Sequence, residues 1–174
     1  QDYHFNADET SILLTTASER RYRWSSIDEN YIYNTKTQQT IKLSDKGGQM
    51  YADFSPKQNR IAYVIDNNLY YKDLDNNREY AITTDGKWNE IINGGSDWVY
   101  EEEFTQVRSF AWSPDGNKIA YYKFDESEVP VFDMMTYKGQ LYPKNYEYKY
   151  PKVGEKNSKV VIYIYDIATQ KSTV

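Results

Sequence analysis

A short unit that recurs along the chain constrains the fold more than any other feature. Residues 54–63 (FSPKQNRIAY) match residues 112–121 (WSPDGNKIAY), and residues 5–14 (FNADETSILL) are a weaker copy. In each copy an aromatic residue ends one strand, a polar turn follows, and a β-branched residue opens the next strand seven positions later. Ser-Pro presets turn geometry and Asp-Gly supplies a tight reversal. Each copy therefore predicts a β-hairpin.

A second predicted hairpin follows each first one, because residues 31–33, 69–71 and 161–165 each lead into a polar turn. Two hairpins give four strands, which is the unit of a propeller blade. The copies start at residues 5, 54 and 112, so they lie 49 and 58 residues apart. This spacing exceeds the roughly 40–45 residues of a plain WD40 blade, so the blades carry insertions.

An antiparallel sandwich also shows evenly spaced strands and turns. The paired hairpins repeat three times, which favours the propeller. The predicted fold class is all-β, a partial β-propeller of roughly three four-stranded blades. Because propellers usually need about four to eight blades, we expect residues 1–174 to be a partial propeller domain.

Composition excludes several classes of function. The chain has no Cys and one His, His4, which leaves too few ligands for a zinc site, and we expect no metal and no cofactor. The net charge is -5 and the basic residues are dispersed, so we expect no nucleic-acid partner. No apolar stretch approaches the roughly 18 residues of a membrane span, so we expect no membrane-spanning segment, and we expect no signal peptide within residues 1–174.

The unusual chemistry lies in three predicted insertions, at about residues 16–30, 86–106 and 125–158. The second contains DWVYEEEF at 97–104, three adjacent carboxylates between aromatic residues. Such like charges repel and raise one another's pKa, unless a cation arrives to bind them. An acidic run is more often a solvated face. The third insertion, rich in Tyr, is expected to be ordered by aromatic packing.

Several motifs resemble one family. NGGSDWVYEEEF at 93–104 resembles the double-glutamate motif of the dipeptidyl peptidase IV family. FAWSPDG at 110–116, FDESEVP at 124–130 and YKYPKVGEKNS at 148–158 resemble the bacterial members. YRWS at 22–25, followed by YIYN at 31–34, is similar to the family's Trp-Arg-His-Ser stretch. The resemblance spans nearly the whole chain.

The resemblance implies an eight-bladed propeller that caps an α/β-hydrolase domain and a serine exopeptidase that releases Xaa-Pro or Xaa-Ala dipeptides. Glu102 and Glu103 would bind the substrate's amino terminus, and Arg23 would contact a substrate carbonyl oxygen. Glu101 is expected to be structural or solvent-facing. The implied partners are a peptide amino terminus, the hydrolase domain of the same chain and a second copy in a homodimer. The implied location is periplasmic, secreted or cell-envelope associated.

Geometry adds one expectation about the glutamates. In a regular strand Glu102 and Glu103 would point to opposite faces. Both can reach one ammonium group only if the backbone leaves strand geometry, so we expect a helical turn or irregular segment over residues 100–104. We expect Trp98 and Tyr100 to lie on one side of an extended segment. There they would pack the insertion onto its neighbours.

The catalytic parts of such an enzyme are missing from this sequence. There is no Gly-x-Ser-x-Gly elbow, and the single His lies near the start of the chain, before any possible nucleophile. We therefore expect the hydrolase domain to lie outside this chain, which alone should be inactive. The alternative is a non-catalytic propeller that binds a protein or peptide partner. A tripeptidyl relative is a nearer alternative, against which the adjacent glutamates argue.

Overall fold

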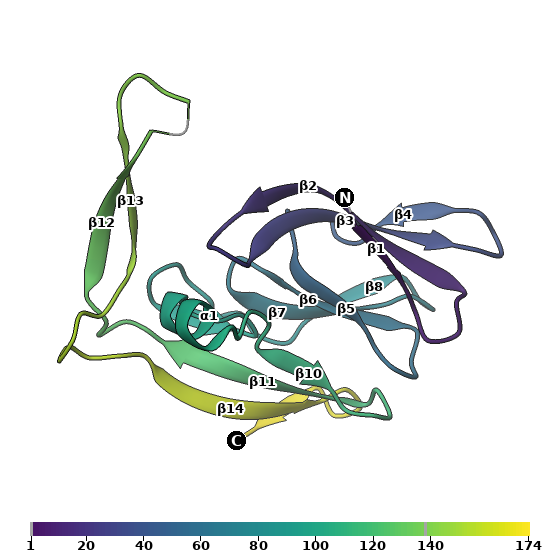
Figure 1. Ribbon diagram of the computed structural model, residues 1–174. Helices are drawn as coiled ribbons and strands as arrows, with labels where there is room; N and C mark the ends of the chain where they lie inside the picture. Colours follow the sequence, from purple (N-terminus) through teal and green to yellow (C-terminus); the bar gives the residue numbers. More distant parts are fainter. Residues whose placement is uncertain (1, 138) are drawn as a thin grey trace.

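Three antiparallel sheets lie face to face in the computed structural model, which describes residues 2–137 and 139–174 (Figure 1). The first sheet consists of β1 (Asp2–Phe5), β2 (Ser11–Arg20), β3 (Ser26–Asn34) and β4 (Thr40–Lys42). The second consists of β5 (Met50–Phe54), β6 (Arg60–Ile65), β7 (Asn68–Asp73) and β8 (Arg78–Ala81). The third consists of β10 (Phe110–Trp112), β11 (Lys118–Asp125), β14 (Lys159–Asp166) and β15 (Lys171–Thr173), and β9 (Ile91–Asn93) pairs with β11.

The three predicted repeat units are confirmed as the first hairpin of each sheet. β1 pairs with β2, β5 with β6 and β10 with β11, all antiparallel. Each turn is closed by the same backbone hydrogen bond, from one N–H to the carbonyl five residues later: Asn6 to Ser11 (3.0 Å), Ser55 to Arg60 (2.9 Å) and Ser113 to Lys118 (2.9 Å). The second hairpins, β3–β4, β7–β8 and β14–β15, are also present.

The middle sheet is buried on both faces, which explains why residues 61–65 of β6 are an unbroken run of apolar and aromatic side chains. Ile61, Tyr63 and Ile65 pack with Leu13 and Ile32 of the first sheet. The alternate residues of β6, Ala62 and Val64, pack with residues of the third sheet such as Phe110 and Ile119. Successive side chains of a strand point to opposite faces, so β6 contributes side chains to two hydrophobic cores.

The third sheet has one covered and one uncovered face. Tyr165 of β14 is buried in the core toward the second sheet, whereas Ile162 and Ile164 are 50% and 45% exposed. The architecture is therefore an open stack of four-stranded sheets, as the fold class predicted. Among the described residues, no helix is long and apolar enough to cross a membrane.

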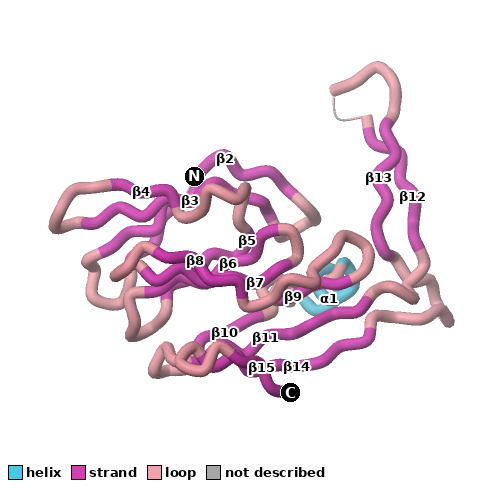
Figure 2. Tube along the Cα trace, turned by 180° about the vertical axis from the view of Figure 1, so that it is seen from behind, coloured by secondary structure: helices cyan, strands magenta, loops and turns pink. Residues whose placement is uncertain are grey.

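The three insertions take different forms. The first, expected at residues 16–30, is an elongation of the β2–β3 hairpin with a register shift between Thr16 and Glu19, so only residues 21–25 form a turn. The second contains β9 and the helix α1 (Trp98–Phe104). The third forms a two-stranded hairpin of β12 (Val131–Thr136) and β13 (Lys144–Lys149), which stands away from the stacked sheets (Figures 1 and 2).

Aromatic packing orders the base of the β12–β13 hairpin, as expected. The ring of Tyr148 lies 5.9 Å from that of Phe132 on the paired strand. Trp98 of α1 lies 4.5 Å from Tyr150 and 6.1 Å from Tyr148. Tyr100 packs instead on Phe124 of β11, at 4.9 Å. Trp98 and Tyr100 therefore fix the insertion to its neighbours, but from a helix and not from the extended segment expected.

Candidate functional site

The acidic segment is helical because its ends carry capping residues. Asp97 is the N-cap of α1, and its Oδ1 accepts a hydrogen bond from the backbone N–H of Tyr100 at 2.8 Å. Its Oδ2 accepts another from Ser158 at 2.5 Å. The helix ends at Thr105, which adopts the left-handed conformation with φ 54°. The expected departure from strand geometry is confirmed, and the helix is longer than expected, seven residues from Trp98 to Phe104.

The three glutamates have three different environments, because successive residues of a helix point about 100° apart. Glu101 is fully buried. The side chain of Glu102 is 18% exposed. Glu103 is exposed and lines a cavity of about 850 Å³ between α1 and the base of the β12–β13 hairpin. Over two positions of the sequence the side chain thus changes from buried, at Glu101, to exposed, at Glu103.

Arg23 lies at the tip of the elongated β2–β3 hairpin and contacts α1. Its Nε is 2.5 Å from Oε1 of Glu102. The Arg23 side chain remains 65% exposed, so the ion pair lies at a solvent-accessible surface. The contact joins two segments almost eighty positions apart in the sequence. The neighbouring aromatic ring of Tyr22 is covered by the guanidinium of Arg21, not by that of Arg23.

The backbone after Arg23 is bound by the buried glutamate. Oε1 of Glu101 accepts hydrogen bonds from the backbone N–H groups of Trp24 at 2.8 Å and Ser25 at 2.9 Å. Glu101 is therefore structural, one of the two possibilities the sequence left open.

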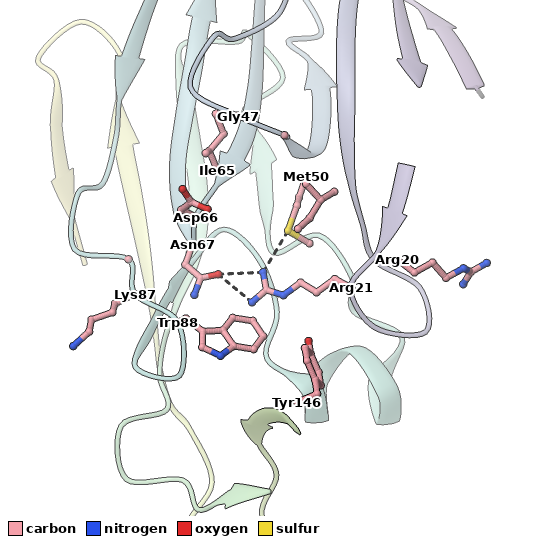
Figure 3. Close-up of a pocket in the computed structure, with 13 residues that line it drawn as sticks. Arg20, Arg21, Gly47, Met50, Ile65, Asp66, Asn67, Lys87, Trp88 and Tyr146 are labelled. Carbon is pink, nitrogen blue, oxygen red and sulfur yellow. Dashed lines mark hydrogen bonds between the residues drawn. The ribbon is translucent and has the colours of Figure 1, made fainter. Parts of the chain in front are cut away.

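Arg21 fixes the other side of the same turn. Its two terminal nitrogens both donate to Oδ1 of Asn67 at 3.1 Å, and its guanidinium lies 4.7 Å from the centre of the Trp88 ring. Arg21 and Trp88 line a cavity of about 550 Å³ together with Met50 and Tyr146 (Figure 3). Figure 3 shows Arg21 pointing toward Asn67, whereas the side chains of Arg20 and Lys87 point away from it.

Two further carboxyl groups are buried near the turn. Burial raises the pKa of Glu126 to about 7, and the negative charge of Asp97 adds to the rise while Arg21 opposes it. Burial also raises the pKa of Asp97, against the hydrogen bonds from Ser158 and from the Tyr100 backbone. Within the described ranges, no group of three His, Cys, Asp or Glu side chains is arranged to hold a metal ion.

The structure thus brings Arg23 and Glu102 together and places Glu103 on an exposed side of the same helix. Their roles toward a ligand stay a prediction. Sequence reasoning missed the anchoring contacts of Glu101 and Arg21 and the burial of Glu126. Three adjacent glutamates are alike in sequence, and only the helix phase distinguishes them.

Comparison with known proteins identifies the family. Residues 6–174 match the family described as the dipeptidyl peptidase IV (DPP IV) N-terminal region. The chain belongs to this family. It is similar to dipeptidyl peptidase 4 of Trichophyton rubrum, with 37% identity over 99% of this chain and 23% of the relative. It is also similar to human prolyl endopeptidase FAP, with 32% identity over 95% of this chain and 22% of the relative.

Solved structures of the family agree with the fold. The crystal structure of Porphyromonas gingivalis dipeptidyl peptidase 4 matches with a TM-score of 0.95 and 40% identity, over 99% of this chain and 25% of that one. A putative dipeptidyl aminopeptidase IV from Bacteroides ovatus matches with a TM-score of 0.66 and 28% identity, over 95% of this chain and 21% of that one. The sheets described above are blades of the N-terminal propeller region of this family. The chain spans about a quarter of the length of these relatives.

Proposed function

We propose that residues 1–174 are the substrate-gating part of a serine dipeptidyl peptidase that releases Xaa-Pro and Xaa-Ala dipeptides from peptide amino termini. In this proposal Glu102 and Glu103 bind the substrate's ammonium group, and Arg23 contacts a carbonyl oxygen of the substrate. The contact between Arg23 and Glu102 carries the proposal, because it joins the two family motifs at one accessible place.

The chemistry of the two glutamates suits an ammonium group. A free amino terminus carries one positive charge and three N–H donors, which two carboxylates can accept together. Charge-assisted hydrogen bonds of this kind are about twice as strong as neutral ones. At an effective dielectric near 20, a charge pair at 4 Å is worth roughly 4 kcal/mol, against roughly 1 kcal/mol in bulk water. The partial burial of Glu102 favours the stronger regime.

Arg23 suits two tasks at once. Through Nε it pairs with Glu102, which orients that carboxylate and compensates its charge before a ligand arrives. The rest of its planar guanidinium, on a side chain 65% exposed, offers donors to a carbonyl oxygen. Together the acids and the arginine define a fixed stop for the amino end of a peptide. Such a stop accounts for a fragment of constant length better than an open groove does.

The proposal includes the parts of the parent protein beyond this chain. An α/β-hydrolase domain supplies the serine nucleophile, since residues 1–174 contain no Gly-x-Ser-x-Gly elbow. Further blades cover the exposed apolar face that carries Ile162 and Ile164. The parent protein is periplasmic, secreted or attached to the cell envelope, and it forms a homodimer.

The test compares amine-bearing and blocked substrates on the full-length protein. We expect cleavage of Gly-Pro-p-nitroanilide and no measurable cleavage of its N-acetyl derivative, because acetylation removes the positive charge. A control substrate that has a free amine but Gly in the second position tests whether the hydrolase domain requires Pro or Ala there. Efficient cleavage of the acetylated substrate would remove the role proposed for the glutamates. Absence of any peptidase activity in the full-length protein would favour the non-catalytic, partner-binding alternative.

A further inference from the structure

Glu101 differs from its two neighbours in being fully buried, between α1 and the turn that carries Arg23. A buried carboxylate is costly unless hydrogen bonds satisfy it. Its Oε1 accepts from two backbone N–H groups, those of Trp24 and Ser25, which lie 77 and 76 residues earlier in the chain. Ser25 is itself 1% exposed. This carboxylate therefore binds the two peptide groups that follow Arg23.

The rest of the turn is fixed as well. The backbone N–H of Arg21 donates to the carbonyl of Ser25 at 3.0 Å, which closes the turn. The Arg20 side chain donates to the carbonyl oxygen of Arg23. The Arg21 side chain binds Asn67, in the turn of the second sheet (Figure 3). The turn is thus held to the second sheet at its start and to α1 at its end.

The hydrogen bonds accepted by Glu101 also affect the neighbouring ion pair, Glu102 and Arg23. Glu101 and Glu102 are adjacent on one helix, and Trp24 and Arg23 are adjacent in one turn. The hydrogen bonds that Glu101 accepts from the turn therefore fix the backbones from which the Glu102 and Arg23 side chains extend. Charge-assisted hydrogen bonds to backbone N–H groups are strong and directional, so they limit movement of the turn against the helix.

We propose that Glu101 is a positioning residue that holds Arg23 against Glu102 before the substrate arrives. This inference rests on the proposed function, because it assigns Glu101 a part in binding the peptide amino terminus. Glu101 acts through its hydrogen bonds to the turn and touches no substrate. Preorganisation of this kind matters because a binding group displaced by about 1 Å loses much of its effect.

The first test uses two substitutions of Glu101 in the full-length protein, with Gly-Pro-p-nitroanilide as substrate. Glu101→Ala removes the acceptor, and we expect kcat/KM to fall about 30-fold, as when hydrogen bonds to a charged acceptor are lost. Glu101→Gln keeps one oxygen that can accept both N–H groups, and we expect kcat/KM within about 3-fold of wild type. Equal losses in both variants would overturn a hydrogen-bonding role, because they would point to the charge of Glu101.

The second test is a double-mutant cycle with Arg23→Ala. If Glu101 acts through Arg23, Glu101→Ala lowers kcat/KM by less than about 3-fold once Arg23 is already absent. Ile61→Val, which removes one methyl group from the core between the first two sheets, controls for destabilisation alone. Thermal unfolding of each variant verifies that the proteins compared are folded. A full 30-fold loss in the Arg23→Ala background would contradict the inference.

Failure of the inference is distinguishable from failure of the proposed function. If Glu102→Gln lowers kcat/KM strongly while Glu101→Ala leaves it unchanged, the amine-binding role of Glu102 stands and the positioning role of Glu101 is wrong. If neither substitution changes the kinetics, the proposed function itself is wrong.

Discussion

Replacing Glu102 by Gln removes the charge that the proposal assigns to amine binding and changes the side-chain volume little. The magnitude follows from the local environment. An ammonium at 4 Å from a carboxylate gains roughly 4 kcal/mol at an effective dielectric near 20 and roughly 1 kcal/mol in water. The Glu102 side chain is 18% exposed, which favours the upper figure, but Arg23 at 2.5 Å already compensates part of its charge. We therefore expect a loss of about 2.7 kcal/mol, a 100-fold decrease in kcat/KM.

The assay measures initial rates of the full-length protein and the Glu102→Gln variant on two substrates. One is Gly-Pro-p-nitroanilide, and the other is its glycolyl analogue, in which a hydroxyl replaces the amine. The variant should lose about 100-fold on the amine substrate and less than about 3-fold on the neutral analogue. Raising the salt concentration should weaken the wild-type preference for the amine, since exposed charges are screened. Equal losses on both substrates would refute the electrostatic reasoning, because the charge of the substrate would then be irrelevant.

The remaining predictions concern four other residues. Glu103→Gln should lower kcat/KM on the amine substrate by about 100-fold, as expected if both carboxylates accept from one ammonium; unchanged kinetics would leave Glu102 as the only amine-binding acid. Arg23→Lys keeps the charge but loses the planar fork, so kcat/KM should fall about 10-fold; wild-type rates would show that the fork is unnecessary. Asp97→Ala removes the N-cap of α1 and should destabilise the protein by about 1 kcal/mol in denaturant unfolding; an unchanged midpoint would contradict this. The pKa of Glu126 is about 7 in the folded state and near 4.5 when unfolded, so its contribution to stability is fully present below pH 4.5 and is lost as the pH rises through 7. Between pH 4.5 and 7, the free energy of unfolding of wild type should therefore fall by about 3 kcal/mol relative to that of Glu126→Gln. A difference that does not change with pH would indicate that the Glu126 carboxyl group is exposed to water.

Local signals in the sequence account for the blades. The Ser-Pro and Asp-Gly turns and the seven-residue interval to a β-branched residue are short-range features, and the same five-residue closing bond forms in all three copies. Turn chemistry of this kind depends little on tertiary context. The helical turn at the glutamates was also predictable, because the resemblance required two adjacent side chains to serve one ligand.

Long-range contacts explain what the sequence did not reveal. Whether a glutamate is buried depends on which side of α1 faces the rest of the protein. The partners of Glu101 lie 77 and 76 residues earlier, and no local pattern indicates them. The elongation of the β2–β3 hairpin was equally hidden, because residues 16–30 contain polar and charged side chains that suit a loop as well as an exposed strand.

A crystal structure of the full-length protein with a bound peptide tests the central claim most directly. The account predicts the peptide's terminal nitrogen within about 3.2 Å of carboxylate oxygens of both Glu102 and Glu103, with Arg23 still paired to Glu102. A terminal nitrogen bound elsewhere, with both carboxylates left in solvent, would contradict it.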